Sequence, residues 1–145
     1  MALVEKSVLV PYSAARMHGL VNDVEHYPEF LPWCSGTQVE TRDNDVVRAS
    51  VSIDYHGIKQ TFKTENRSSP PQLIDIRLVS GPFRHLDGEW RFTELASDAC
   101  KIEFRLHYEF ANRLLEKLVG PVFKHIANSL VDAFLRRAQQ VYGTK

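Results

Sequence analysis

The sequence is poor in the residues that build metal sites and disulfide frameworks. Its 145 residues include two cysteines, Cys34 and Cys100, which form no paired motif. A zinc site or a disulfide framework is therefore not expected. None of the six histidines stands four residues from another, the spacing that a metal site on a helix prefers. We predict no metal site and interpret the histidines as ordinary surface or partly buried side chains.

Long apolar runs and a net charge are also lacking. No stretch approaches the ~20 apolar residues of a membrane-spanning helix. Glu5 and Lys6 lie inside the first apolar run, which does not fit a secretory signal. The 18 basic and 18 acidic side chains cancel, so nucleic acid or an anionic membrane could bind only through a local patch. These features favour a reduced, cytoplasmic protein without a transmembrane segment.

Motifs of nucleophilic or nucleotide chemistry are absent. There is no Gly-x-Ser-x-Gly elbow, phosphate-binding glycine loop or dinucleotide fingerprint. Neither cysteine has neighbours in the sequence that would obviously lower the pKa of its thiol. Asp87 and Glu89 share a strand face and could act as an acid and a base, but they alternate with apolar residues and should therefore point to solvent. We predict no catalytic residue.

What the sequence does contain is an alternating strand that leads into a long amphipathic helix. In residues 101–110 every second side chain is apolar, and the residues between them are charged. A strand places these two sets on opposite faces, which is typical of an antiparallel sheet with one solvated face. The following helix must cover the apolar face. A long helix gripped by a curved sheet commonly leaves a cavity, so we expect a ligand site between them.

The C-terminal helix is expected to run from its cap at Asn112 to Gly143. The pair Gly120-Pro121 predicts a kink or a break, because proline removes a backbone donor and clashes with the preceding turn. Arg137 lies within the apolar stripe, and we expect it to tether the helix to the sheet, with contact to a ligand or a partner as the alternative. The predicted stripe comprises Leu115, Val119, Val122, Phe123, Ile126, Leu130, Ala133, Phe134 and Val141.

The rest of the chain predicts six further strands in hairpin order and two short helices. The first helix is capped by Ser13 and extends to Val24, and the second begins near Pro28 and cannot continue past Pro32. The length and composition suit one domain over residues 1–145. The six strands are expected at residues 3–10, 37–42, 46–55, 58–64, 73–79 and 86–92.

Three stretches carry a resemblance to a known family. They are Tyr-Pro-Glu-Phe-Leu-Pro-Trp-Cys at 27–34, Gly-Pro-Phe at 81–83 with Leu86, Gly88 and Trp90, and the end at 131–143. Together they resemble the coenzyme Q-binding protein family, whose bacterial members are also called ribosome association toxins and carry older labels of oligoketide cyclase. The resemblance covers nearly the whole chain. It implies an α+β helix-grip fold, similar to START domains and birch-pollen allergens. In that fold a seven-stranded curved antiparallel sheet wraps around the C-terminal helix, and two short helices lie between strands 1 and 2.

Three functions stay open. The first is a non-enzymatic carrier of a ubiquinone-like isoprenoid quinone that supports respiration, with no cofactor beyond the bound lipid and with transient contact with the inner membrane left open. The second is a ribosome association toxin that binds a ribosomal subunit and blocks subunit joining. The third, a polyketide cyclase or dehydratase, needs an inward acid or base and ranks last. The basic edge that could serve the second function comprises Arg113, Lys117, Lys124, Arg136 and Lys145.

The predicted ligand-binding residues come from the sheet and from the C-terminal helix. Each buried methylene of a prenyl tail contributes ~0.8 kcal/mol, so an apolar tunnel could retain such a tail without a charged contact. Tyr55, Tyr108 and His85 are the predicted polar groups that orient the ligand. The full predicted set is Trp33, Val51, Phe62, Ile76, Leu86, Trp90, Phe104, Tyr108, Val122, Phe123 and Ile126.

Overall fold

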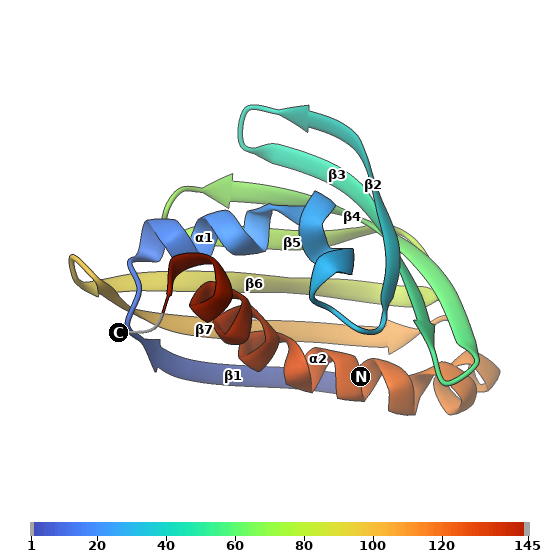
Figure 1. Cartoon of the computed structure of the whole chain (residues 1–145). Helices are drawn as coiled ribbons and strands as arrows, with labels where there is room; N and C mark the ends of the chain where they lie inside the picture. The colour runs from blue at the N-terminus through green and yellow to red at the C-terminus, as the bar shows by residue number, and fades with distance from the viewer. Residues whose placement is uncertain (1, 144–145) are drawn as a thin grey trace.

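The computed structural model describes residues 2–143 (Figure 1). Seven strands precede a long C-terminal helix, and two short helices separate the first strand from the second. The elements are β1 (Ala2–Val10), α1 (Ala14–Asn22), the 3-10 helix η1 (Val24–Glu29), β2 (Cys34–Asp43), β3 (Val46–Tyr55), β4 (Ile58–Ser69), β5 (Leu73–Ser80), β6 (Phe83–Ala96), β7 (Ala99–Phe110) and α2 (Arg113–Tyr142).

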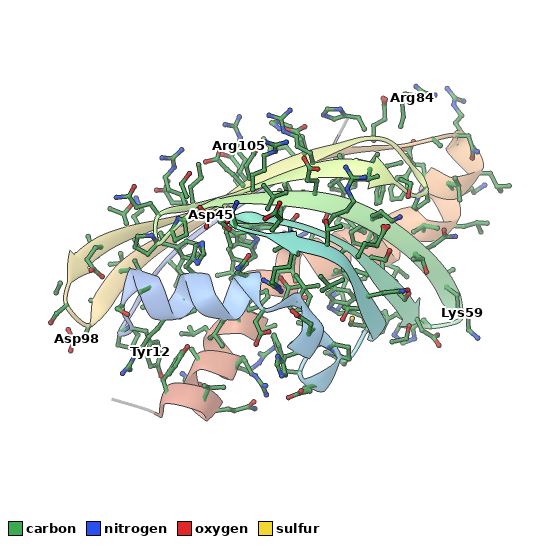
Figure 2. All side chains as sticks on the ribbon, turned by 90° about the horizontal axis from the view of Figure 1, so that it is seen from above. Tyr12, Asp45, Lys59, Arg84, Asp98 and Arg105 are labelled. Carbon is green, nitrogen blue, oxygen red and sulfur yellow. The ribbon has the colours of Figure 1, made fainter. Side chains whose placement is uncertain are left out.

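The seven strands form one antiparallel sheet in the order β1-β7-β6-β5-β4-β3-β2. The sheet curves around α2, and α1 and η1 cover part of the same concave side (Figure 1). Side chains of the other face, such as Arg105, point away from the helices (Figure 2). The predicted helix-grip arrangement, with its seven strands, its long final helix and its two short helices, is confirmed.

Alternation along the strands decides which face meets the helices. On β7 the five apolar side chains from Ile102 to Phe110 are buried, whereas the charged residues between them are exposed or half-buried. Trp90 on β6 lies opposite Phe104 on β7, and the two ring centroids are 4.4 Å apart. Each fully buried large apolar side chain contributes ~1.5–3 kcal/mol, so this face holds much of the stability. Asp87 and Glu89 lie on the other face and pair with His85 and Arg91.

Helix α2 begins and ends as the sequence predicts. The Asn112 side chain accepts a hydrogen bond from the Leu115 N–H at 2.9 Å, and Gly143 ends the helix with a φ of 83°. The helix continues through Pro121, so of the two predicted alternatives the break is wrong, and the kink stays a prediction. Pro121 lies on the exposed side, where water can reach the carbonyl group that the proline leaves unpaired. Within residues 2–143 no helix combines the length and the apolar character needed to cross a bilayer.

Other boundaries depart from the prediction near α1 and at the end of α2. Helix α1 ends at Asn22, and Val24 opens η1 with its side chain buried in the core. Pro28 therefore lies near the end of the second helix and not in its first turn. Val141, which we assigned to the buried stripe, is 49% exposed. The last turn of α2 does not lie under the sheet, because Tyr142 packs on Tyr12 beside α1.

Gly88 on β6 is the tightest glycine of the sheet. A Cβ atom there would lie 2.4 Å from the Arg105 carbonyl oxygen and 2.9 Å from Leu106 Cδ1. The oxygen belongs to a paired strand and cannot move freely. We expect Gly88→Ala to lower the free energy of unfolding by ~2–3 kcal/mol, as overpacking does. Urea denaturation measures this change.

The matched control is Gly36→Ala on β2, where an added Cβ meets nothing within 4 Å. This substitution should change the free energy of unfolding by no more than ~1 kcal/mol. An equal decrease in the free energy of unfolding of Gly88→Ala and Gly36→Ala would contradict the packing argument.

Candidate functional site

An apolar cavity lies between the concave face of the sheet and α2. Its walls come from η1, from the residues just before β2, from β3 to β7 and from α2. Its volume of about 100 Å³ is small, since pockets for drug-sized ligands usually hold ~300–1,000 Å³. The space suits a small apolar group as it stands, and a longer ligand requires the walls to move apart.

The structure brings together nine of the eleven predicted ligand-binding residues. Tyr108 and Val122 do not line the cavity: the Tyr108 ring packs on Phe123 with centroids 4.7 Å apart, and Val122 is half-buried on the flank of α2. A role in ligand binding stays a prediction for the other nine. They are Trp33, Val51, Phe62, Ile76, Leu86, Trp90, Phe104, Phe123 and Ile126.

The polar groups of the cavity differ from those that we predicted. Tyr55 stacks on His125 with ring centroids 5.7 Å apart, and His85 pairs with Asp87 on the outer face of the sheet. Neither lines the cavity. Thr64 and Asn66 on β4 do line it, and the Thr64 hydroxyl donates to Asn66 Oδ1 at 3.0 Å.

The sequence held a signal for this pair. Thr64 and Asn66 follow Phe62 at a spacing of two, which places all three on the same face of a strand. The remaining lining residues that sequence reasoning missed include Tyr27, whose buried hydroxyl donates to the Val21 carbonyl group. Burial raises the pKa of Tyr27 far above its usual value. The others are Val24, Ala49, Leu106, Ala127, Leu130 and Phe134.

A cluster of five aromatic rings closes one end of the cavity. Phe123 on α2 is its centre, with ring centroids 4.9 Å from Phe83 and 6.2 Å from Phe62. Phe62 and Phe123 also line the cavity, so the cluster continues its wall toward the first turns of α2. The remaining members, Tyr108 and Phe110, pack on Phe123 from β7. We call this set the aromatic cluster.

Helix η1 closes another side of the cavity and is held to α2. The Arg137 guanidinium donates to Glu29 Oε1 at 2.9 Å and lies 5.0 Å above the Phe30 ring. Phe30 in turn packs on Phe134, which lines the cavity, with centroids 5.3 Å apart. Arg137 is therefore a tether, as predicted, but it connects α2 to the η1 segment and not to the sheet.

The described lining of the cavity is mainly apolar. Among the described residues, its lining includes no aspartate, glutamate, histidine, lysine, arginine or cysteine. Both cysteines are buried elsewhere in the core. Burial raises the pKa of the Cys34 thiol, and it raises the pKa of Cys100 to about 11, so both thiols stay protonated at neutral pH. No cluster of potential metal ligands occurs within residues 2–143.

Comparison with known proteins places the chain in a family. Residues 10–135 match the family described as polyketide cyclase / dehydrase and lipid transport. The chain belongs to this family. A family described by both catalysis and lipid transport does not decide between these activities.

Individual relatives span the whole chain. The ribosome association toxin RatA of Vibrio cholerae O1 strain O395 is 46% identical over 143 residues, covering 99% of both chains. The mitochondrial coenzyme Q-binding protein COQ10 homolog B of Xenopus laevis is 28% identical over 142 residues, covering 95% of this chain and 58% of that protein. The resemblance that the sequence motifs indicated is confirmed.

Solved structures confirm the START-like helix-grip fold. The Zhui aromatase/cyclase of Streptomyces sp. R1128 superposes with a TM-score of 0.84 at 17% identity, covering 96% of this chain and 94% of that one. At this level of identity the likeness concerns the fold alone. The activity of the cyclase therefore does not transfer to this chain through the superposition.

One buried histidine near the site lacks a hydrogen-bond partner. His18 on α1 is 7% exposed and packs edge-on against Phe92 with ring centroids 5.8 Å apart. Its Nε2 atom has no partner among the described residues. Burial lowers the pKa of His18, and the carboxylate of Asp45 offsets this only in part. The folded protein therefore favours the neutral ring.

This histidine predicts a loss of stability in mild acid. The unfolded chain takes up the His18 proton near pH 6.5, whereas the folded chain takes it up only at lower pH. The free energy of unfolding should fall as the pH drops from 7 to 5. In His18→Leu this fall should be shallower, and stability at pH 7 should change by less than ~1 kcal/mol or rise. Urea denaturation at several pH values measures both the pH dependence of stability and the stability at pH 7.

His26→Gln is a control of opposite sign. The pKa of exposed His26 is raised, first by its hydrogen bond to Asp23, so its protonation stabilises the fold in acid and this contribution disappears as the pH rises. His26→Gln lacks this contribution, so its free energy of unfolding should fall more steeply with decreasing pH than that of wild type. Identical pH profiles for wild type and His18→Leu would contradict the assignment to His18.

Proposed function

We propose that this protein binds and carries an isoprenoid quinone, or a lipid of similar shape, without catalysing a reaction. The observation that carries the proposal is the apolar cavity between the sheet and α2, whose described lining contains no charged side chain. Burial of each methylene group contributes ~0.8 kcal/mol, so a prenyl tail needs no ion pair to be retained. The printed name of the COQ10 relative, a coenzyme Q-binding protein, supports this choice of ligand.

The ligand enters this proposal with a defined orientation. The Asn66 carbonyl oxygen accepts from Thr64, which leaves the Asn66 amide N–H groups as donors inside the cavity. A quinone carbonyl oxygen is a suitable acceptor for them. The head group would therefore lie against β4, and the tail would pass along the apolar side chains of α2 and the sheet.

The cavity must widen before it holds a whole quinone, because its volume is about 100 Å³. Its most easily displaced wall is η1, a six-residue 3-10 helix held to α2 by Arg137. Opening this wall would break the Arg137–Glu29 pair and separate Phe30 from Phe134, but it would leave the hydrogen bonds between strands in place. We propose that the protein is cytoplasmic and binds the inner membrane transiently to exchange its ligand.

A ligand-bound protein should lose its lipid when the cavity is filled from within. Ala127 on α2 lines the cavity and is 1% exposed, so Ala127→Leu adds three carbon atoms to a space of about 100 Å³. We expect the quinone that co-purifies from the native host to fall several-fold, while the free energy of unfolding stays level or rises. Mass spectrometry of organic extracts measures the quinone.

Ala15→Leu on the exposed side of α1 serves as the matched control and should retain the wild-type lipid content. Extracts of wild-type protein that repeatedly contain no lipid would refute the carrier proposal, as would undiminished quinone in Ala127→Leu.

Binding to a ribosomal subunit is the second candidate function. A relative that is 46% identical over 143 residues bears the name ribosome association toxin. Of the predicted basic edge, Arg113, Lys117, Lys124 and Arg136 are exposed on α2, and Lys145 lies outside the described residues. These cations could contact ribosomal RNA, although the balanced overall charge provides no general attraction.

Co-sedimentation with separated ribosomal subunits tests this candidate. Contacts to phosphate groups make binding decrease with salt, so the affinity should fall steeply between ~50 and ~200 mM salt. Lys124→Gln should weaken binding at low salt, and the exposed Lys6→Gln on β1 should not. This function is refuted if the protein does not bind ribosomal subunits, or if its affinity for them does not change with salt concentration.

A further inference from the structure

The first turns of α2 expose two large apolar side chains. Leu114 is 65% exposed and Leu118 is 55% exposed. Four residues apart on a helix, they lie on one side, and exposed Pro121 and His125 continue the same line over the next turns. The opposite side of the helix is buried against the sheet through Val119, Phe123 and Ile126. No element among the described residues covers the two leucines.

Three cations flank these leucines. Arg113, Lys117 and Lys124 are exposed and lie within about 40° of one another around the helix axis, about 60–100° from Leu114 and about 100–140° from Leu118. Glu116 borders these cations on the side away from the leucines, about 60° from Arg113 and about 100° from Lys117. The leucines and the three cations together form what we call the basic-leucine face.

A fourth cation extends the charge at this end of the molecule. The Arg84 side chain is 65% exposed, and its guanidinium donates to the Ala111 carbonyl oxygen at 3.2 Å, directly before α2. Figure 2 shows Arg84 beside the start of α2, far from Asp98 at the tip of the β6–β7 hairpin. Glu109 neutralises it in part, at an N–O distance of 3.5 Å.

We propose that the basic-leucine face is a docking surface for an anionic lipid bilayer. The leucines would enter the boundary between head groups and acyl chains, and the cations would meet lipid phosphates, as on helices that lie in a membrane interface. RNA phosphates could pair with the cations, but an RNA surface would offer the exposed leucines no apolar environment. A second copy of the same face would bring like charges together. The bilayer is the partner that satisfies both sets of side chains.

The docking surface lies across α2 from the aromatic cluster. Phe123 projects inward from the same helix, and a Cβ added at Gly120 would lie 3.8 Å from the Phe110 ring. The cluster continues the wall of the cavity, so docking would bring one end of the cavity close to the membrane. The inference extends the proposed lipid carriage but is tested without any quinone, so either can fail alone.

The experiment is co-sedimentation of the full chain with vesicles of phosphatidylcholine, with or without phosphatidylglycerol. Wild type should bind the phosphatidylglycerol vesicles more tightly, and the preference should shrink with salt. Leu118→Glu should weaken binding to these vesicles tenfold or more. Lys117→Gln should weaken it about fivefold at low salt, as expected for one cation at an anionic surface.

Leu95→Glu is the matched control, because Leu95 is also 55% exposed and lies near the β6–β7 hairpin at the other end of the sheet. It should bind vesicles as wild type does, and thermal melting should show all variants folded. The proposal is overturned if wild type does not bind vesicles or if the two glutamate variants bind equally. It is also overturned if Leu118→Glu impairs only self-association or only binding to ribosomal subunits.

Discussion

Burial of one stripe of α2 against the concave face of the sheet is the contact on which the structure depends. Phe134 meets Trp90 with ring centroids 5.4 Å apart, and Phe123 meets Tyr108 at 4.7 Å. The concave side of the sheet carries apolar side chains from several strands, so without the helix a large apolar surface would face water. The cavity lies along the same contact, where side chains of α2 and of the sheet leave a gap. Stability and the cavity therefore have one origin.

The small volume of the cavity places a constraint on any function. Protein interiors pack about as densely as organic crystals, so the space of about 100 Å³ is an unusual gap and not an open channel. A carrier with this interior has to open and close for each ligand. Opening beside η1 would have to separate Tyr27 and Phe30 from Phe134, whereas the backbone hydrogen bonds between strands could remain intact.

Much of the architecture was predictable, because it follows from periodicity. The alternation in residues 101–110 and the stripe from Val119 to Phe134 identified the two surfaces that meet, and these segments contain Phe104, Phe123 and Ile126 of the cavity lining. The other six predicted residues that line the cavity come from the strands β3 to β6 and from Trp33. Polar details were harder to predict. Thr64 and Asn66 share a strand face with Phe62 by their spacing, but a search for apolar lining residues passes over polar side chains on that face. Tyr55 and His85 were assigned by residue type, but their positions at a hairpin turn and on the outer face remove them from the site.

The order of the strands leaves β1 and β2 as unpaired edges, so the sheet is an incomplete barrel whose missing wall is supplied by α2. That wall is attached to the concave side through side chains and not through a ladder of backbone hydrogen bonds. Exchanging a few residues on it can therefore enlarge, reshape or fill the interior at no cost to strand pairing. Evolution could thus adapt one scaffold to guests of very different size, which suits a family whose description joins ring-forming enzymes with lipid transporters.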